Sequence, residues 1–559
     1  MSSDPDYHIF RDGRRQVSAA ELVQPLGDAL VSLSPRSSTD ELLAVLLRAG
    51  ELECALSDVG ASPEDCERAA RLTDLIAVVA LQDDSRQGLA YWQDPAPTAL
   101  SLIDELSYSG MVTVGVPEGF AYYAVHPLDY ADHIAKCNER WASVFIVGVR
   151  SIGTTLSAVV AAGLRQMGLP VERTTVRPTG HPYERQCVFS DAQLNLITAA
   201  SSRGSEFIVC DEGPGRSGSS LLSVAEALER AGVARSHIVL LCSHEPDVHT
   251  LCATDAVRRW SRLRSIHAGP TKRLPADGFR SAASGEWRRS LLSAEQELPA
   301  CWPQFERLTY FSLDGRTVLI FEGYGQFGQR LSERNRKLSD AGFGLPYLGH
   351  EAGFGRHQRI EGRAGRPQDL TSPLLARMAE YCAWRAREFA AMDAEPSELE
   401  TMARVNFERE FGFEPSDLSL PLVRPAICDN QMMPHAWLNA TSGAWLKLDA
   451  AARGDDHFFP GPCDIAWDLA GIAVEWSLSE EDRCFLLARY RACSGEDASD
   501  RLAAYEMAYT TFRMAWSRMA AASVGIPAEN TNLIRDYQRY RSRLADTLAK
   551  LQPQYAQTQ

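Results

Sequence analysis

Short apolar runs alternate with amphipathic segments between residues 110 and 265, and this alternation restricts the fold more than any other feature of the chain. The apolar runs read MVTVGV, ASVFIVGV, VERTTV, EFIVC and HIVLLCS, and segments such as TTLSAVVAAGLRQMG and SLLSVAEALERAG stand between them. Strands that alternate with helices predict βαβ units and a mostly parallel sheet covered by helices. We therefore expect an α/β region over residues 106–268.

The flanking regions have other patterns. Apolar residues recur at helical spacing before residue 105, and Ser62-Pro63 is typical of a helix start. Asp314-Gly315 between two apolar runs predicts a hairpin, and long helical patterns follow it. The chain thus predicts an α/β plus α+β multidomain protein. Its expected parts are a helical N-terminal region (1–105), the α/β region (106–268), a linker (269–304) and a C-terminal region (305–559).

Composition excludes several classes of protein. The formal net charge of −16 over 559 residues argues against a general binder of nucleic acids. The 13 Cys include no C-x-x-C pair, which is typical of reduced thiols without a structural zinc site. No apolar run approaches the roughly 18 residues that span a bilayer, and the N-terminus lacks a secretory signal. We expect a cytoplasmic protein that does not bind membranes, and an oligomer is an open alternative.

The segment FIVCDEGPGRSGSS, residues 207–220, combines two acids with a loop of small residues. Asp211 and Glu212 follow the expected strand, at the strand end where ligands bind in open α/β sheets. Gly215 and Gly218 allow a tight turn whose amide groups point inward, and the next helix begins with a partial positive charge. Two carboxylates repel a phosphate but suit ribose hydroxyls or a metal ion. The segment therefore predicts a site for a sugar phosphate.

This pattern resembles the motif by which type I phosphoribosyltransferases bind phosphoribosyl pyrophosphate (PRPP). The resemblance implies a parallel-sheet phosphoribosyltransferase-like domain in which Asp211 and Glu212 are catalytic and hold the ribose hydroxyls. Glu stands at the second acid, and Ser219 replaces the usual Thr. The implied partners are PRPP and an unknown small-molecule acceptor. The implied 5′-phosphate loop consists of Gly215, Arg216, Ser217, Gly218 and Ser219.

An earlier strand-to-helix turn, VGVRSIGTT, occupies the place of that family's pyrophosphate loop. The resemblance implies pyrophosphate contacts from Gly148, Arg150, Ser151, Gly153 and Thr154. Segments 118–131 and 174–186 carry rings and cations that suit an anionic ligand, or that simply pack on the surface. The residues expected to bind the acceptor or to form a hood over it are Tyr123, Arg177, His181 and Arg185.

Residues 427–476 resemble the C-terminal lobe of aminoglycoside phosphotransferase-like small-molecule kinases. PGPCDIAWDLAG matches a helix start of that family, and Asp449 matches its metal-binding acid. Asp429 is the expected catalytic acid, although no His stands two positions before it and Pro434 stands where the family has Asn. His435 is a second expected metal ligand. The resemblance implies ATP and Mg²⁺ as cofactors, yet the strand VLIF carries no Lys to hold the nucleotide's phosphates.

Together these patterns predict a bifunctional enzyme of small-molecule metabolism. One half would transfer phosphoribosyl from PRPP to an acceptor, and the other would be a linked ATP-dependent kinase-like domain. The alternative is a regulatory protein that senses PRPP or a nucleotide and binds a partner through a degenerate kinase half. A nucleotide-binding α/β domain without transfer activity is a further alternative. Asp455, Asp456 and His457 form either a metal cluster or a solvated turn.

Overall fold

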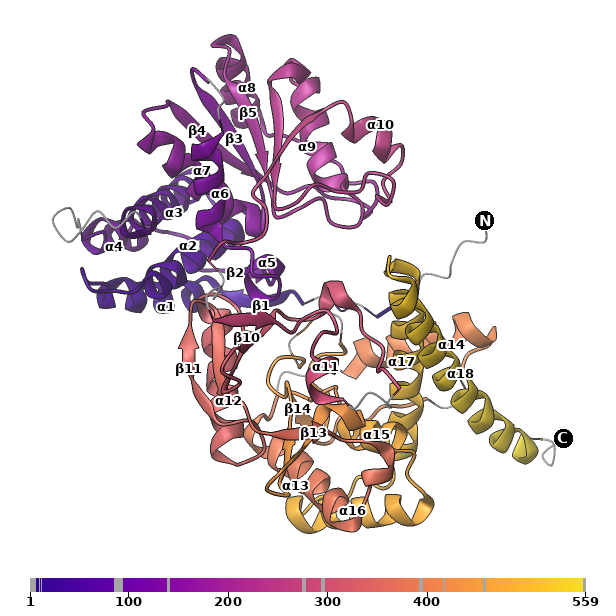
Figure 1. Cartoon of the computed structure of the whole chain (residues 1–559). Coiled ribbons are helices and arrows are strands. Elements are labelled where there is room, and N and C mark those ends of the chain that lie inside the picture. Colours follow the sequence, from indigo (N-terminus) through magenta and orange to yellow (C-terminus); the bar gives the residue numbers. More distant parts are fainter. Residues whose placement is uncertain are drawn as a thin grey trace.

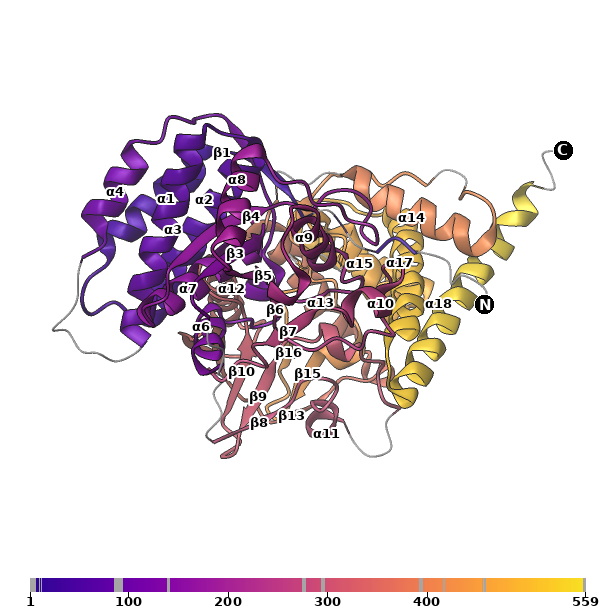
Figure 2. The same ribbon diagram turned by 90° about the horizontal axis from the view of Figure 1, so that it is seen from above.

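The computed structural model describes residues 7–9, 11, 13–84, 94–137, 141–273, 278–292, 297–391, 396–415, 418–454, 456 and 459–555. The chain forms a mixed α/β structure of two halves that meet around the short helix α5 (Glu118–Ala121), as Figure 1 shows. Seen from above, the N-terminal helices and the last helix lie at opposite ends of the molecule (Figure 2). No helix within the described ranges is long and apolar enough to cross a membrane.

A parallel sheet of five strands organises the first half, as the alternating pattern predicts. Its order is β4-β3-β5-β6-β7. This is a doubly wound order, in which strands are added first on one side of β3 and then, from β5 on, on its other side. Every residue of β3 and of β6 is buried, because helices cover both faces. The strands are β3 (Val144–Val149), β4 (Val171–Val176), β5 (Glu206–Cys210), β6 (Ile238–Cys242) and β7 (Arg264–His267). The connecting helices are α7 (Ile152–Gln166), α8 (Asp191–Ser202), α9 (Ser219–Arg230) and α10 (Ala256–Trp260).

The helical N-terminal region shares its core with this sheet. Leu46 and Ile76, from α2 and α3, belong to the same buried cluster as Leu156 of α7. The expected strand MVTVGV pairs with residues 15–18 instead of joining the parallel sheet. The region before residue 105 is therefore a layer of the α/β half. Its elements are β1 (Arg15–Ser18), α1 (Ala19–Ser32), α2 (Thr39–Val59), α3 (Pro63–Asp84), α4 (Ala96–Asp104) and β2 (Met111–Val114), and α6 (Pro127–Lys136) follows α5.

An antiparallel sheet begins the C-terminal half, with the order β11-β12-β10-β9-β8. The expected Asp-Gly hairpin is present, and Gly315 has the left-handed φ of +74° that its turn needs. The expected linker 269–304 contains β8, so the sheet starts before residue 305. The strands are β8 (Phe279–Ser281), β9 (Thr309–Ser312), β10 (Thr317–Phe321), β11 (Tyr347–Glu351) and β12 (Phe354–Gln358), and α12 (Gln326–Asp340) crosses from β10 to β11. We call this part the sheet lobe.

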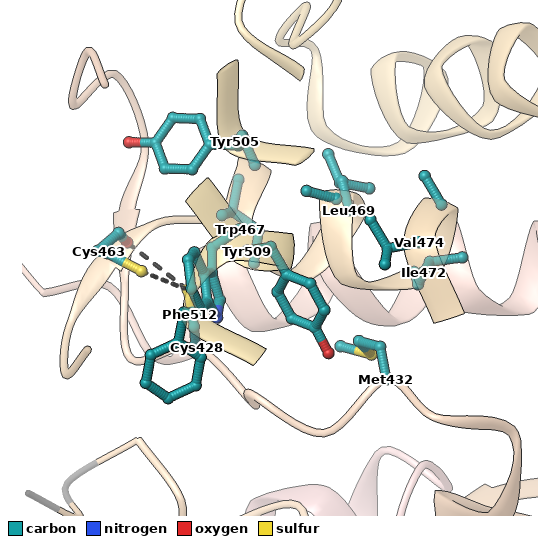
Figure 3. Close-up of a cluster of buried hydrophobic side chains, with 14 of the residues drawn as sticks. Cys428, Met432, Cys463, Trp467, Leu469, Ile472, Val474, Tyr505, Tyr509 and Phe512 are labelled. Atoms are coloured by element: carbon teal, nitrogen blue, oxygen red, sulfur yellow. Dashed lines mark hydrogen bonds between the residues drawn. The ribbon is translucent and has the colours of Figure 1, made fainter. Parts of the chain in front are cut away.

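The rest of the C-terminal half, the helical lobe, packs around a second buried cluster. Figure 3 shows Trp467, Tyr509 and Phe512 together in it, and the Trp467 and Tyr509 ring centroids lie 5.0 Å apart. The Cys428 and Cys463 sulfur atoms lie beside these rings, 3.6 Å apart. The helices are α11 (Arg288–Leu291), α13 (Ser372–Glu388), α14 (Pro396–Phe411), α15 (Ala466–Glu475), α16 (Glu480–Ser494), α17 (Leu502–Ser523) and α18 (Pro527–Tyr555). The short strands are β13 (Gly362–Ala364), β14 (Pro425–Ala426), β15 (Trp437–Ala440), β16 (Trp445–Lys447) and β17 (Cys463–Asp464).

The buried Arg173 side chain forms ion pairs that join the N-terminal helices to the parallel sheet. The Arg173 guanidinium of β4 donates to Glu53 at 2.8 Å and to Asp74 at 2.7 Å, and its side chain is 3% exposed. Removing one partner of a buried ion pair leaves an uncompensated charge and costs about 3–5 kcal/mol. We expect Arg173→Met to lower the free energy of unfolding by that amount, measured by urea denaturation. The matched control Arg203→Met, which breaks the exposed pair with Glu172, should cost less than about 1 kcal/mol.

Candidate functional sites

Asp211 and Glu212, which we call the acid pair, lie where the strand order reverses between β3 and β5. The Glu212 carboxylate accepts a hydrogen bond from the Gly119 amide of α5 at 3.0 Å. The Tyr130 hydroxyl donates to the main-chain carbonyls of Asp211 and Glu212, at 3.0 and 2.9 Å. The crevice at such a reversal is where doubly wound folds bind ligands. The fold thus puts both carboxyl groups at the position that the sequence predicts.

Burial raises the pKa of both carboxyl groups. The pKa of Asp211 rises to about 7, although the nearby Arg177 acts against the rise. The pKa of Glu212 rises to about 8, because the charges of Glu118 and Asp211 add to the effect of burial. Two carboxyl groups with raised pKa values at the carboxyl ends of the strands mark a candidate functional site. A ligand that donates hydrogen bonds to them, or that compensates their charge, would offset the cost of burying the charged form.

The loop after the acid pair has the form of an anion site. Gly215 and Gly218 have φ values of +53° and +69°, which turn the chain sharply into α9. No described residue accepts a hydrogen bond from the amide groups of Gly215, Arg216 and Ser217. The Ser217 and Ser219 hydroxyls, however, donate to the carbonyl of Pro182 at 2.9 and 2.6 Å. The amides are therefore available to a phosphate, whereas both hydroxyls would first have to leave Pro182.

The turn before α7 lies next to the acid pair, and two of its glycines are there for packing. A Cβ atom on Gly153 would lie 2.6 Å from the carbonyl oxygen of Cys210, the residue before Asp211. A Cβ atom on Gly148 would lie 2.5 Å from the carbonyl oxygen of Gly153. These contacts hold the start of α7 against the end of β5. The expected pyrophosphate contact from Gly148 is not supported, because that residue lies inside the buried strand β3.

Ser151, at the N-cap of α7, has strained backbone. Its φ of +107° and ψ of −113° lie in a region that residues with a side chain rarely adopt. Such strain is concentrated at functional sites. The next residues, at the start of α7, include Thr154, whose buried hydroxyl has no hydrogen-bond partner among the described residues. Thr154 is fully buried, and the expected role of Ser151 and Thr154 in a pyrophosphate loop stays a prediction.

Two of the four arginines expected to bind the ligand, Arg150 and Arg177, are held by one residue of α2. Asp58 accepts from Arg150 at 3.2 Å and from the Arg177 Nε at 3.1 Å, and Arg177 also donates to the Cys54 sulfur. Arg150 also donates to Thr175 of β4, so its guanidinium lies between α2 and β4. The structure corrects the expected role of Arg150, which is a structural cation here. Sequence reasoning missed Asp58, because nothing local links α2 to the loop after β3.

The remaining expected hood residues are divided between two places. His181 is exposed, and its ring packs edge-on against Tyr183 at 5.4 Å. Arg185 is half-buried near Arg177, which together with burial lowers its pKa. Tyr123, by contrast, lies at the junction of the two halves, where its ring centroid is 6.4 Å from that of Phe305. Burial and the charges of nearby acids, Glu212 among them, raise the pKa of Tyr123, and its expected place in a hood with His181 and Arg185 stays a prediction.

A cavity of about 720 Å³ separates the sheet lobe from the helical lobe. Apolar side chains line it from both sides, a form that suits a flat ring. From the sheet lobe come Phe311, Val318 and Ile320, and from the helical lobe come Leu438 and Leu448. A five-stranded antiparallel sheet with one crossing helix, set over a helical lobe with a cleft between, is the kinase-like arrangement that the sequence predicts.

Asp429 does not reach this cavity, which corrects its expected catalytic role. Its side chain is fully buried and lies 3.0 Å from the Lys447 ammonium, which is also fully buried. Tyr381 donates to the same carboxylate, and Arg385 lies 3.8 Å away. The carboxylate of Asp468 accepts from the Asp429 amide at 2.8 Å. Asp429 is thus a structural acid within the helical lobe.

Gln431 lines the cavity instead, two residues after Asp429. Kinase catalytic loops place a metal-binding Asn five residues after the catalytic Asp. Five residues after Gln431 stands Ala436, directly before β15, and Asp449 follows the β15–β16 hairpin as a metal-binding Asp would. In this register Gln431 stands in place of the catalytic Asp and cannot act as a base, and Ala436 stands in place of the Asn and has no side-chain atom that could bind a metal ion.

The two residues expected to bind a metal ion in the C-terminal half, Asp449 and His435, both have protein partners. Asp449 pairs with Arg453 at 3.0 Å, so a guanidinium already compensates the one acid in the correct position. The His435 ring stacks on Trp287 at 5.5 Å, and burial lowers its pKa to about 4. The described residues contain no group of three or more His, Cys, Asp or Glu that could hold a metal ion. Asp455 and His457 lie outside the described residues.

Strand β10 carries no Lys, as the sequence indicates, and a different cation, Arg307, lies near its end. Glu322 follows β10, where Asn335 and Tyr347 donate to its carboxylate. Arg307 donates to the carbonyl of Phe321, the last residue of β10, at 3.1 Å, and its side chain lines the cavity. Arg307 precedes β9, so no strand motif in the sequence indicates its position. It was missed for that reason.

Comparisons with solved structures report matches that cover about half of the chain. No protein-family model and no curated protein matches the chain. The choline kinase LicA from Streptococcus pneumoniae is 16% identical, with a TM-score of 0.32 over 47% of this chain and 97% of that one. The macrolide 2′-phosphotransferase MphH from Brachybacterium faecium is 12% identical, with a TM-score of 0.30 over 47% of this chain and 93% of that one. Likeness of this degree establishes no activity for the chain.

The acid pair predicts a pH dependence of stability. Its folded pKa values lie above the ordinary 3.8 and 4.5, so between about pH 4 and pH 8 the folded state binds more protons and loses stability as pH rises. Asp211→Asn with Glu212→Gln removes this loss. We expect the drop in unfolding free energy from pH 5 to pH 8, measured with urea, to shrink by about 1–3 kcal/mol in the double variant. An unchanged drop would contradict the burial of both groups.

Proposed function

We propose that the α/β half is a phosphoribosyltransferase that takes PRPP, and that the C-terminal half binds a nucleotide without transferring its phosphate. One observation carries the first part. Two half-buried carboxyl groups with raised pKa values lie between two strand-to-helix turns at the reversal of a doubly wound sheet. Acids suit the hydroxyls of a sugar, and the free loop amides after them suit its phosphate.

The acid pair and the two turns would divide the substrate between them. Asp211 and Glu212 would accept hydrogen bonds from the ribose hydroxyls, and the amides of residues 215–217 would donate to the 5′-phosphate. The strained turn at Ser151 would face the pyrophosphate. Mg²⁺ would enter with PRPP as part of the substrate and offset the charge of the leaving group.

In the reaction, the bond between C1 of the ribose and the pyrophosphate oxygen breaks, and C1 bonds to the acceptor. The pyrophosphate leaves with the electron pair, and the acceptor loses a proton. Positive charge builds up on the ribose ring, so carboxylates next to its hydroxyls stabilise the transition state more than the ground state. The start of α7 and the loop before α9 hold the two ends of the substrate and so fix its orientation.

Loss of the acid pair should remove this activity. We expect Asp211→Asn with Glu212→Gln to reduce pyrophosphate release from PRPP at least about 100-fold, because charge stabilisation at the transition state is lost. Release is measured with PRPP·Mg²⁺ and a panel of amines, bases and alcohols. Glu245→Gln is the matched control, since Glu245 is an exposed acid after β6 at the same edge of the sheet.

Two outcomes separate the alternatives. Normal release from the double variant contradicts the proposed site. Calorimetric binding of PRPP by the native chain, with no release across the acceptor panel, favours the regulatory alternative, in which the same site senses PRPP.

For the C-terminal half, Gln431 and Ala436 favour binding over catalysis. We expect ATP to raise the melting temperature of the chain, while no ADP forms with choline, ethanolamine or gentamicin as acceptors. A kinase without its catalytic Asp has no group to orient the attacking hydroxyl. ADP formation by the native chain that is abolished in Asp449→Asn would contradict this expectation, because it would show a working phosphotransfer site.

A further inference from the structure

Helix α5 is bonded to both halves of the molecule. On one side its Gly119 amide donates to the Glu212 carboxylate at 3.0 Å. On the other side its Phe120 carbonyl accepts from the Tyr324 amide, at the start of α12, at 3.0 Å. Figure 1 shows α5 at the junction between the parallel sheet and the sheet lobe. A shift of α5 therefore changes the surroundings of Glu212 and of the sheet lobe together.

Arg307 connects this helix to the cavity. One nitrogen of its guanidinium donates to the carbonyl of Ala121, the last residue of α5, at 3.3 Å and to that of Phe321 at 3.1 Å. The guanidinium also lies 5.3 Å from the centre of the Tyr122 ring. The residue is 5% exposed and lines the cavity. Its Nε has no hydrogen-bond partner among the described residues. One edge of the cation is thus bonded to α5 and another is unsatisfied.

We propose that a phosphate-bearing ligand in the cavity binds the Arg307 guanidinium, which lines the cavity, and that Arg307 and α5 transmit its presence to Glu212. Burial takes the Arg307 cation out of water, and an anionic oxygen offsets that cost with a charge-assisted hydrogen bond. The bound anion fixes the guanidinium, which then holds the carbonyl of Ala121 more firmly. The Gly119 amide stays on Glu212, and the acid pair is preorganised for its own ligand.

The coupling has a sign and a size. Because the cavity ligand favours the arrangement of α5 that the acid pair uses, each ligand should strengthen the binding of the other. Coupling energies between two sites typically change affinity about 5–150-fold, and both ligands must feel the same factor. This part of the inference rests on the proposed function, since it takes PRPP as the ligand of the acid pair. The protection of α5 by a cavity ligand does not depend on it.

Hydrogen exchange with ATP as the probe tests the inference directly. In the native chain we expect 1 mM ATP to slow amide exchange both in residues 118–124 and in residues 434–440, which border the cavity. In Arg307→Met, which keeps an apolar stem and removes the donors, only residues 434–440 should slow. The inference is overturned if ATP slows residues 434–440 alone in the native chain, if it slows neither segment, or if Arg307→Met leaves the protection of α5 unchanged.

A second pair of variants probes α5 without touching either ligand. A Cβ atom on Gly323 would lie 3.2 Å from the carbonyl of Ala121, so Gly323→Ala pushes on α5. The control Gly342→Ala also carries a positive φ, of +67°, but its Cβ atom would meet nothing within 4 Å. We expect Gly323→Ala to weaken PRPP·Mg²⁺ binding, measured by calorimetry, at least about 5-fold and to abolish its enhancement by ATP. Gly342→Ala should change neither quantity.

The outcomes of this pair separate two failures. Equal effects of the two substitutions would overturn the role of α5. If the native chain binds no PRPP at all, the proposed transferase function fails, and the exchange experiment alone then decides whether the cavity acts on α5.

Discussion

The reversal of strand order between β3 and β5 is the constraint on which the rest of the structure depends. Where the connections after two adjacent parallel strands run to opposite sides, a crevice forms at the carboxyl ends of the strands. In this chain the turn after β3 and the loop after β5 both lie at that place. The close contact between Gly153 and the carbonyl of Cys210 holds the start of α7 against the end of β5. The acid pair that follows is half-buried at this position, and partial burial raises the pKa of both carboxyl groups.

The first half could be predicted well from the sequence, because its signals are local. Each strand, turn and helix around the acid pair occupies a continuous run of residues, and alternation alone indicates a parallel sheet. What the sequence could not indicate is which distant charges meet. Asp58 of α2 pairs with Arg150 and Arg177, and this pairing depends on how the N-terminal helices pack against α7. No periodicity in the chain encodes that docking.

The second half shows a different limit of sequence reasoning. An acid after a strand suggested a catalytic loop, but burial decides whether an acid can act, and Lys447 lies some twenty positions away in the chain. The β15–β16 hairpin fixes the register of the loop before it. The cavity lining then shows that Gln431, two residues after Asp429, faces the cavity. The fold of the half was predictable from its helices and its Asp-Gly turn. The structural place of Asp429 became clear only when its burial was known.

The segment expected to be a linker has a consequence for dividing the protein. Because β8 forms one border of the antiparallel sheet, a cut anywhere between residues 282 and 305 would strip that border from the C-terminal fragment. The backbone of β9 would then present unpaired amide and carbonyl groups to solvent, a surface that recruits strands from other molecules. Fragments meant to be studied separately should therefore part ahead of Phe279, or self-association will be mistaken for native assembly.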